Sequence, residues 1–433
     1  MQNSNKTEVK KTKTSKSKVN LQPVRGTRDY LPEKQIFREQ AMEKIKRIFE
    51  KYGFVPMQTP ALEYASVLGK KYGEEEKLIF KFKFGDEELG LKYDQTVPTA
   101  RVYAANRQTL GAPFKRYVLD RAWRGERPQA GRLREFLQCD IDTLGTYSLA
   151  ADAELLACAN EALAAIGLTN FTWRISTRAL AENFLKSCGV ADVKLQAAMR
   201  AIDKLDKIGE EGVAKELLEK GIGQAAVDTI FSLLKFKGDF DKIRSTIKID
   251  PSVEDELLKF ISYLDEFGVK NYTLDLSIIR GLDYYTGPIF EAKAPGFKGT
   301  IAAGGRYNHL IELFSGVEIP ATGLTIGLDR ILEFLKFESK KTKTAIYVVG
   351  IGKDVIPLVQ KFRAEGIPTD LDLMSRGLKK NLDFANKRGI PYVAIVGQEE
   401  LSKGKIKLKE MSTGKEELLS FEQIVAKLRA LPQ

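Results

Sequence analysis

Residues able to bind or polarise a substrate gather in two stretches that lie far apart along the chain. Residues 123–142, WRGERPQAGRLREFLQCDID, carry four arginines, two amides and four carboxylates. Guanidinium groups bind phosphate oxygens through a planar fork of N–H donors, so these arginines predict a site for a phosphate-bearing ligand. Residues 280–308, RGLDYYTGPIFEAKAPGFKGTIAAGGRYN, combine arginines, paired tyrosines and glycines. Two such stretches predict a binding site that is assembled across a sheet.

Composition excludes several other kinds of chemistry. The chain has 433 residues, for which we expect two or three domains, and His309 is its only histidine. This argues against His-rich metal sites and Ser-His-Asp triads. The cysteines Cys139, Cys158 and Cys188 are odd in number and far apart, which argues against a thiol zinc site and favours a reducing compartment. With no long apolar run and no secretory signal in the sequence, we expect a cytoplasmic protein without membrane contact.

The formal net charge of +11 favours a polyanionic partner, nucleic acid first. Basic proteins often bind nothing acidic, so charge alone does not decide the matter. Part of the excess lies in the Lys-rich stretch KTEVKKTKTSKSK, residues 6–18, which is poor in apolar residues and is expected to be disordered. This tail has two equally favoured interpretations, non-specific affinity for RNA or a solubilising extension.

The first polar stretch is predicted to be a long-looped antiparallel hairpin. RYVLDRAWR, residues 116–124, reads as one strand, ERPQAGR as a loop, and REFLQCDIDTLG as the returning strand. The period of two puts Gln138, Asp140 and Asp142 on one face of the second strand and an apolar set on the other. The polar face predicts a binding surface, although a solvated sheet face would show the same pattern.

Other elements follow from periodicity and composition. A helix is expected from Pro32 to Gly53, with apolar residues at helical spacing that form either core or a dimer interface. Helical patterns dominate residues 178–270 and show no catalytic cluster, so they predict an inserted helical subdomain. After a charged linker at residues 336–344, short strands alternate with helices, which predicts a small α/β domain with parallel strands.

The sequence contains no Walker loop, and the glycine pair of AAGGRYN lacks the Rossmann spacing. A nucleotide would therefore be held by side chains on an antiparallel sheet. RAWRGERPQAGRLREFLQCDID resembles the second signature motif of class II aminoacyl-tRNA synthetases, and TGLTIGLDRIL, with Arg330, resembles the third. RGLDYYTG and AAGGRYN resemble the two motifs peculiar to histidyl-tRNA synthetases. The resemblance covers nearly all of the chain that is expected to be ordered.

The resemblance implies an α/β (α+β) fold, with an antiparallel sheet flanked by helices. Its expected domains are a disordered tail at residues 1–20, a class II catalytic domain at 21–336 with its helical insertion, and a three-layer α/β anticodon-binding domain at 344–433. It implies a homodimer that activates L-histidine with ATP, releases pyrophosphate and transfers histidine to the 3′ end of tRNA(His). Mg²⁺ is expected on the ATP phosphates, with no metal held by protein side chains.

The resemblance also implies roles for individual residues. Arg124 would contact the α-phosphate of ATP, and Arg280 would lie by the substrate carboxylate and stabilise charge as the adenylate forms; these two are the expected catalytic residues. The adenine and the outer phosphates would be met by Glu126, Arg132 and Arg330. Histidine would be bound by Arg280 together with Asp94, Thr96, Gln138, Asp142, Tyr284 and Tyr285. Candidates for tRNA contact are Arg127, Gln129, Lys379 and Lys380.

The residue types suit these roles independently. An ammonium needs acceptors, which Asp94, Thr96 and Gln138 supply, and an imidazole can be held between the Asp142 carboxylate and the Tyr285 phenol. Such a pocket should reject apolar side chains, because its own polar groups would be left unpaired. Attack of a carboxylate on a phosphate needs positioning and charge neutralisation more than a base.

Two departures from the family pattern leave the fine geometry of substrate and tRNA contacts open: Gln95, where leucine or glycine is frequent, and Gly377, where a small polar residue is frequent. Lys379 and Lys380 could equally be a solvated helix start. Two rival functions remain. One is the non-catalytic regulatory subunit of ATP phosphoribosyltransferase, which shares the catalytic fold but typically lacks the C-terminal domain and the ATP arginines. The other is a synthetase-like RNA-binding protein.

Overall fold

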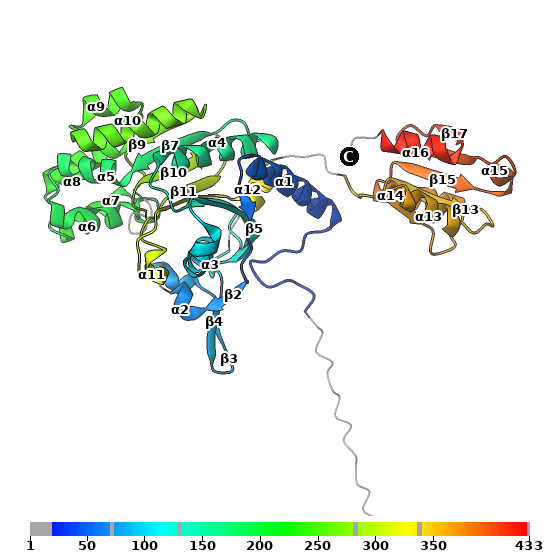
Figure 1. The fold of residues 1–433 in the computed structure, drawn as a ribbon, viewed down its shortest axis with the longest axis horizontal. Coiled ribbons are helices and arrows are strands. Elements are labelled where there is room, and N and C mark those ends of the chain that lie inside the picture. The colour runs from blue at the N-terminus through cyan, green and yellow to red at the C-terminus, as the bar shows by residue number, and fades with distance from the viewer. Residues whose placement is uncertain (1–19, 70–72, 129–130, 280–284, 336–339, 431–433) are drawn as a thin grey trace, which may run out of the picture.

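The predicted hairpin forms the middle of a large sheet. In the computed structural model, which describes residues 20–69, 73–128, 131–279, 285–335 and 340–430, β5 (Phe114–Trp123) pairs antiparallel with β6 (Glu135–Leu144). The expected disorder of residues 1–20 concerns a segment that lies, apart from Asn20, outside these ranges. The described sheet has the order β1-β5-β6-β12-β11-β10-β7-β9-β8, and it is antiparallel except at β1–β5 and β7–β9 (Figure 1). Its other strands are β1 (Val55–Pro56), β7 (Thr172–Thr177), β8 (Lys237–Gly238), β9 (Tyr272–Asp275), β10 (Pro288–Lys293), β11 (Ala302–Arg306) and β12 (Ala321–Ile326).

Helices cover the sheet and create its core. α1 (Pro32–Lys51) begins with proline at its first turn, and Gly53 follows its end with a φ of 78°. Its buried residues Ala41, Ile45 and Phe49 recur at helical spacing and join the main apolar cluster, so the core interpretation of this helix is confirmed. α1 packs on α4 (Leu149–Ala165), which also contacts α10 (Pro251–Glu266).

A second apolar cluster lies around α3 (Thr96–Leu110) and α11 (Glu312–Ser315). It includes Tyr103 from α3, Leu144 from the end of β6, and Tyr307 from the segment that follows β11. The short α12 (Leu328–Phe334) follows β12, as the strand-to-helix pattern predicted, and packs against β6. These contacts fix the ends of β6, β11 and β12 relative to α3.

The stretch between β7 and β9 is mainly helical, as the sequence indicates. It contains α5 (Arg178–Ser187), α6 (Leu195–Ile202), α7 (Leu205–Glu219), α8 (Gln224–Leu234), α9 (Phe240–Thr246) and α10. The pattern did not reveal β8, which lies inside this stretch and pairs with β9 at the edge of the large sheet. A small separate sheet, in the order β2-β4-β3, consists of β2 (Leu62–Tyr64), β4 (Glu87–Leu91) and β3 (Lys81–Phe84), next to α2 (Ala65–Leu68).

The C-terminal part is a three-layer α/β domain (Figure 1). Its sheet has the order β14-β13-β15-β16-β17, with α13 (Ile356–Ala364) and α16 (Phe421–Arg429) in one apolar cluster and α14 (Leu378–Arg388) in another. β13 (Ile346–Gly350), β14 (Thr369–Leu371) and β15 (Tyr392–Val396) are parallel, as predicted. Because β16 (Ile406–Glu410) and β17 (Glu416–Leu419) are antiparallel, the expectation of parallel strands holds for only part of this sheet. The short α15 (Gln398–Ser402) follows β15.

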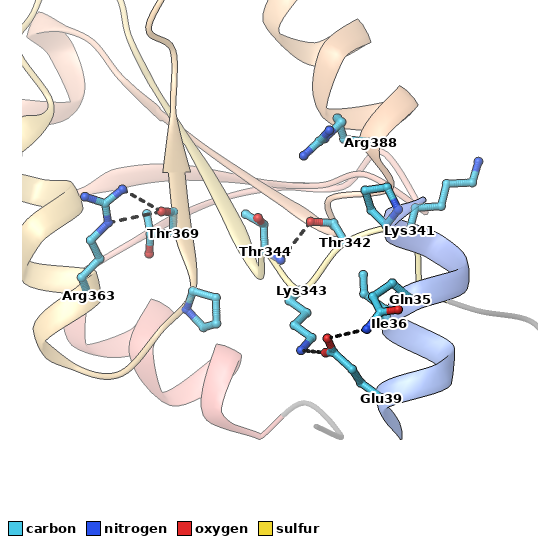
Figure 2. A pocket seen from close by; sticks show the side chains of 12 residues that line it. Gln35, Ile36, Glu39, Lys341, Thr342, Lys343, Thr344, Arg363, Thr369 and Arg388 are labelled. Carbon is cyan, nitrogen blue, oxygen red and sulfur yellow. Dashed lines mark hydrogen bonds and ion pairs between the residues drawn. The ribbon is translucent and has the colours of Figure 1, made fainter. Parts of the chain in front are cut away.

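The charged linker contacts the first helix. Figure 2 shows a pocket bounded by α1, by linker residues from Lys341 onward and by the C-terminal domain. Within it, the Lys343 ammonium pairs with the Glu39 carboxylate, which also accepts a hydrogen bond of 3.1 Å from Gln35 Nε2. A charge of the linker therefore holds this segment against α1. In the described ranges, no helix has the length and apolar character needed to cross a membrane.

Candidate functional site

The polar face of β6 is buried. Gln138, Asp140 and Asp142 are only 4%, 2% and 3% exposed. The alternate residues face the main apolar core, namely Leu137, Cys139 and Ile141. The solvated interpretation of the polar face is therefore wrong, because burying two carboxylates is costly unless partners or a ligand compensate. Their partners define what the site can hold.

Asp142 has a partner on each oxygen. Arg116, which lies directly opposite on β5, places Nη2 2.5 Å from Asp142 Oδ2. The hydroxyl of Tyr307 donates a hydrogen bond to Asp142 Oδ1. Neither residue was singled out from the sequence. Arg116 could have been found, because the hairpin register puts it across from Asp142, but Tyr307 comes from a distant segment.

Asp140 is a third carboxyl group at this site, and the resemblance assigned it no role. Burial raises the pKa of Asp140 to about 7, the Arg116 guanidinium opposes this shift, and Asp142 and Asp94 add to it. Its Oδ1 has no hydrogen-bond partner in the described part of the protein. Three carboxyl groups thus lie near one another, and Arg116 pairs with Asp142, so the pocket favours a positively charged ligand.

Asp94 is held at the start of α3. Its Oδ1 accepts hydrogen bonds from the backbone N–H groups of Thr96, at 2.9 Å, and Val97, at 3.1 Å. This is helix capping, and it fixes the carboxylate at the positive end of the helix. The neighbouring Gln95 is buried and donates from Nε2 to the carbonyl of Arg121 at 2.9 Å. The departure at Gln95 therefore joins α3 to β5 rather than facing a ligand.

Tyr285 lies beside the acidic groups. Burial raises the pKa of its phenol, and Asp94, Asp142 and Asp140 raise it further, in that order. A Cβ added at Gly305 would lie 2.7 Å from Tyr285 Cδ1, so the second glycine of AAGGRYN makes room for this ring. The structure thus brings Asp94, Asp142 and Tyr285 together. The predicted roles of Arg280 and Tyr284 concern residues outside the described ranges.

Arg124 is fixed between aromatic rings. Its guanidinium carbon lies 4.4 Å from the centre of the Tyr93 ring and 5.1 Å from that of Phe136. Its Nε donates to the Tyr93 carbonyl at 3.2 Å. Because Tyr93 directly precedes Asp94, this arginine stands next to the acidic pocket.

The other arginines expected at the nucleotide gather around Arg330. Its Nε donates to the carbonyl of Gly131 at 2.8 Å. Burial lowers the pKa of Arg330, and Arg132 and Arg124 lower it further, whereas Glu126 opposes the shift. Arg132 Nη1 lies 3.6 Å from Glu126 Oε2. Mutual repulsion among cations shows a surplus of positive charge, which suits a polyanionic ligand such as a triphosphate.

The candidate tRNA residues are not brought together. Arg127 is exposed on the hairpin loop, whereas Lys379 and Lys380 are exposed at the start of α14 in the C-terminal domain. Gln129 lies outside the described ranges. Gly377, the second departure, precedes α14, and a side chain there would meet no atom within 4 Å. This departure therefore imposes no steric change on the loop.

The cysteines and the single histidine do not belong to the acidic pocket or to the arginine cluster. Cys139, Cys158 and Cys188 are buried free thiols whose pKa values are raised by burial. His309 is exposed, with its Nδ1 3.6 Å from Glu312 Oε2. Among the described residues, no group of three His, Cys, Asp or Glu side chains is placed to hold a metal ion.

Comparison with solved structures identifies the fold class. The chain resembles the crystal structure of histidyl-tRNA synthetase from Nostoc sp., with a TM-score of 0.83, 29% identity and coverage of 95% of this chain and 99% of that one. A Bacillus halodurans protein described as an ATP phosphoribosyltransferase regulatory subunit/histidyl-tRNA synthetase shares the fold, with a TM-score of 0.73, 21% identity and coverage of 87% and 98%. The large antiparallel sheet, its flanking helices and the C-terminal domain therefore constitute the fold of a class II aminoacyl-tRNA synthetase.

Sequence comparison identifies the family. The model of the family described as histidyl-tRNA synthetase matches residues 26–331, and that of the anticodon binding domain matches residues 345–431. A histidine–tRNA ligase of Clostridium tetani is 36% identical, over 92% of this chain and 96% of its own length. One from Thermococcus kodakarensis is 35% identical, over 94% and 98%. The chain belongs to the histidyl-tRNA synthetase family.

Proposed function

We propose that this chain is a histidine–tRNA ligase. It would activate L-histidine with ATP to give histidyl-adenylate and pyrophosphate, and then transfer histidine to the 3′ end of tRNA(His). The main support for the proposal is that two oppositely charged subsites lie side by side. Asp94 belongs to the acidic pocket and directly follows Tyr93 in the chain. The carbonyl and the ring of Tyr93 hold Arg124, which belongs to the arginine cluster. The acidic pocket suits an amino acid with an ammonium and an imidazole, and the arginine cluster suits a triphosphate.

In the acidic pocket, Asp142 would accept the imidazole N–H and Tyr285 would contact the other ring nitrogen. Asp94, Thr96 and Gln138 would receive the α-ammonium. Gln138 Oε1 is buried and has no hydrogen-bond partner among the described residues, which supports a role in binding a substrate donor. Tyr284, which precedes Tyr285, is proposed to line the same pocket on the strength of the RGLDYYTG motif.

In the arginine cluster, Arg124 would contact the α-phosphate, while Glu126, Arg132 and Arg330 would meet the adenine and the outer phosphates. A carboxylate oxygen of histidine would attack the α-phosphorus, forming one P–O bond as the bond to the pyrophosphate oxygen breaks. Because negative charge develops on the phosphoryl oxygens, fixed guanidinium groups lower the barrier without a proton transfer. Arg280 is proposed to act with Arg124 in this step.

Mg²⁺ would accompany the ATP, where it neutralises charge on the phosphates. In the second step the terminal hydroxyl of the tRNA would attack the histidyl carbonyl, and AMP would leave. Arg127 and Gln129 are proposed to contact the acceptor end, and Lys379 and Lys380 the anticodon region. The exposure of Arg127 and of both lysines supports this assignment, since phosphate contacts need accessible cations.

We also propose a cytoplasmic homodimer. β1 forms one edge of the large sheet, and Val55 in this strand is 47% exposed. Leu62, on the edge strand β2 of the separate small sheet, is 46% exposed. Exposed apolar residues on edge strands suit burial against a second copy. The molar mass of the purified chain, measured by light scattering, tests this.

The decisive experiment is ATP–pyrophosphate exchange with each of the twenty amino acids. Exchange that depends on histidine alone, and that Arg124→Ala abolishes, is the expected result. Arg121→Ala is the matched control, because Arg121 lies near the end of β5, shortly before Arg124, but is exposed and pairs with Glu135 at 3.1 Å. No exchange with any amino acid from a folded sample would contradict the proposal and favour the regulatory-subunit or RNA-binding alternative. The cluster of Arg124, Arg132 and Arg330 weighs against that outcome.

A further inference from the structure

The carboxylate of Asp142 is held from two sides by residues that come from different strands. Arg116 reaches Oδ2 across the β5–β6 ladder, with 2.5 Å between Nη2 and Oδ2. Tyr307, which directly follows β11, donates its hydroxyl hydrogen to Oδ1. With a separate partner on each oxygen, the plane of the carboxylate has little freedom to rotate.

A glycine on the third strand leaves room for this carboxylate. Gly323 on β12 lies opposite Asp142, and a Cβ added there would lie 2.8 Å from Asp142 Cγ and closer still to Oδ1. The same Cβ would lie 3.2 Å from Tyr307 Cε1. Any larger residue at position 323 would therefore displace both Asp142 and Tyr307. The glycine belongs to TGLTIGLDRIL, in which only Arg330 had an assigned role.

The two partners keep their hydrogen-bonding roles in this environment. Burial and Asp142 raise the pKa of Tyr307 well above its ordinary value, so the phenol stays protonated and remains a donor. Arg116 is 1% exposed, and its Nη2 also lies 3.5 Å from the carbonyl of Gln95. Arg116 thereby connects Asp142 to the residue that follows Asp94.

We propose that Tyr307, Arg116 and Gly323 are positioning residues that orient Asp142 toward the imidazole and so set the selectivity for histidine. This inference rests on the proposed function, in which Asp142 accepts the imidazole N–H. A carboxylate with fixed orientation binds a hydrogen-bond donor well only when the donor approaches from one direction. An apolar side chain in the same place binds poorly, because the carboxylate charge is then left unpaired. None of the three residues needs to touch the substrate.

The test separates positioning from a general structural role. Tyr307→Phe keeps the ring and removes the donor, so KM for histidine in the exchange reaction is expected to rise about 10- to 100-fold. The KM for ATP should stay near the wild-type value, and the melting temperature should fall only modestly, because Arg116 still pairs with Asp142. The matched control is Tyr103→Phe, because Tyr103 is also buried in the catalytic domain and donates at 2.8 Å to the carbonyl of Gly111, away from Asp142. This control should leave KM for histidine unchanged.

A second pair of variants addresses the space around the carboxylate. Gly323→Ala should raise KM for histidine at least as much as Tyr307→Phe does. Gly327→Ala should not, since a Cβ at Gly327 makes only an ordinary contact, 3.4 Å from the carbonyl oxygen of Ile301. Wild-type KM for histidine in Tyr307→Phe, or equal rises in KM for histidine and for ATP, would overturn the inference. A wild-type chain without histidine-dependent exchange would instead overturn the proposed function itself.

Discussion

The guanidinium of Arg306 is buried against the carboxylate of Asp152, which connects the end of β11 to α4. Arg306 Nε lies 3.1 Å from Asp152 Oδ2, and its Nη atoms donate at 2.8 Å to the carbonyls of Thr146 and Ser148. This arginine, the second one in the stretch 280–308, is thus a structural residue. It holds β11 in place for the next residue, Tyr307.

Removing Arg306 should therefore destabilise the fold. Arg306→Met leaves Asp152 as a buried charge without its partner, which costs about 3–5 kcal/mol. Urea denaturation would measure the loss in the free energy of unfolding. The double variant Arg306→Met/Asp152→Leu should recover most of that loss, because it removes the stranded charge as well. A single variant within about 1 kcal/mol of wild type would contradict the structural role.

The arginine cluster predicts a selective effect on ATP. Arg330→Lys keeps the charge but loses the planar fork and the hydrogen bond to Gly131, so kcat/KM for ATP in histidine-dependent exchange should fall about 10- to 100-fold. The KM for histidine should change little. The control is Arg28→Lys, because Arg28 is exposed and pairs with Glu333 on α12, the helix that also carries Arg330. An equal fall in kcat/KM for ATP in both variants would show that the effect comes from disturbing α12 and not from the loss of the Arg330 guanidinium.

Asp140 predicts a pH dependence of stability in the ligand-free protein. Its pKa is raised from the ordinary value of 3.8 to about 7 in the folded state, so between these values the folded state holds a proton that the unfolded state has released. Stability should fall as the pH rises from about 4 to 7 and then level off. The groups facing it are Arg116, which opposes the shift, and Asp142 and Asp94, which enhance it.

Asp140→Asn removes this titration. The variant should exceed wild type in stability by a larger margin at pH 8 than at pH 5, as measured by urea denaturation at both values. Asp86→Asn, in the exposed turn between β3 and β4, is the matched control and should behave like wild type at both values. A wild-type chain that is equally stable at pH 5 and pH 8 would contradict the prediction.

Local patterns were sufficient for most of the fold. Alternation of polar and apolar residues identified the β5–β6 hairpin, and helical spacing with Pro32 and Gly53 located α1. The antiparallel order of β16 and β17 was missed, and so was β8, because strand partners are chosen by tertiary packing that a single segment does not encode. The strand order β6-β12-β11 was not predicted either.

For the candidate site, too, local motifs were recognised from the sequence, whereas contacts between distant segments were not. The charged residues near the hairpin and Arg330 were recognised from motifs, and the structure clusters Arg124, Arg132 and Arg330. The two partners of Asp142 were missed for different reasons. Arg116 could have been found from the register of the predicted hairpin, which places it opposite Asp142. Tyr307 lies more than a hundred residues from Asp142 in the sequence, so no local pattern connects the two. The capping of α3 by Asp94 could have been predicted, since an aspartate just before a helix is a frequent cap.

The glycine pair of AAGGRYN provides a last prediction about the tyrosine side of the pocket. Gly305→Ala would place a Cβ 2.7 Å from both the Pro288 carbonyl oxygen and Tyr285 Cδ1. Since the backbone of β10 cannot yield easily, the Tyr285 ring must shift, and kcat/KM for histidine should fall about 10-fold or more. Gly377→Ala is the control, because a Cβ there meets no atom within 4 Å and the φ of −65° suits any residue. Unchanged histidine kinetics in Gly305→Ala would show that Tyr285 does not contribute to the pocket.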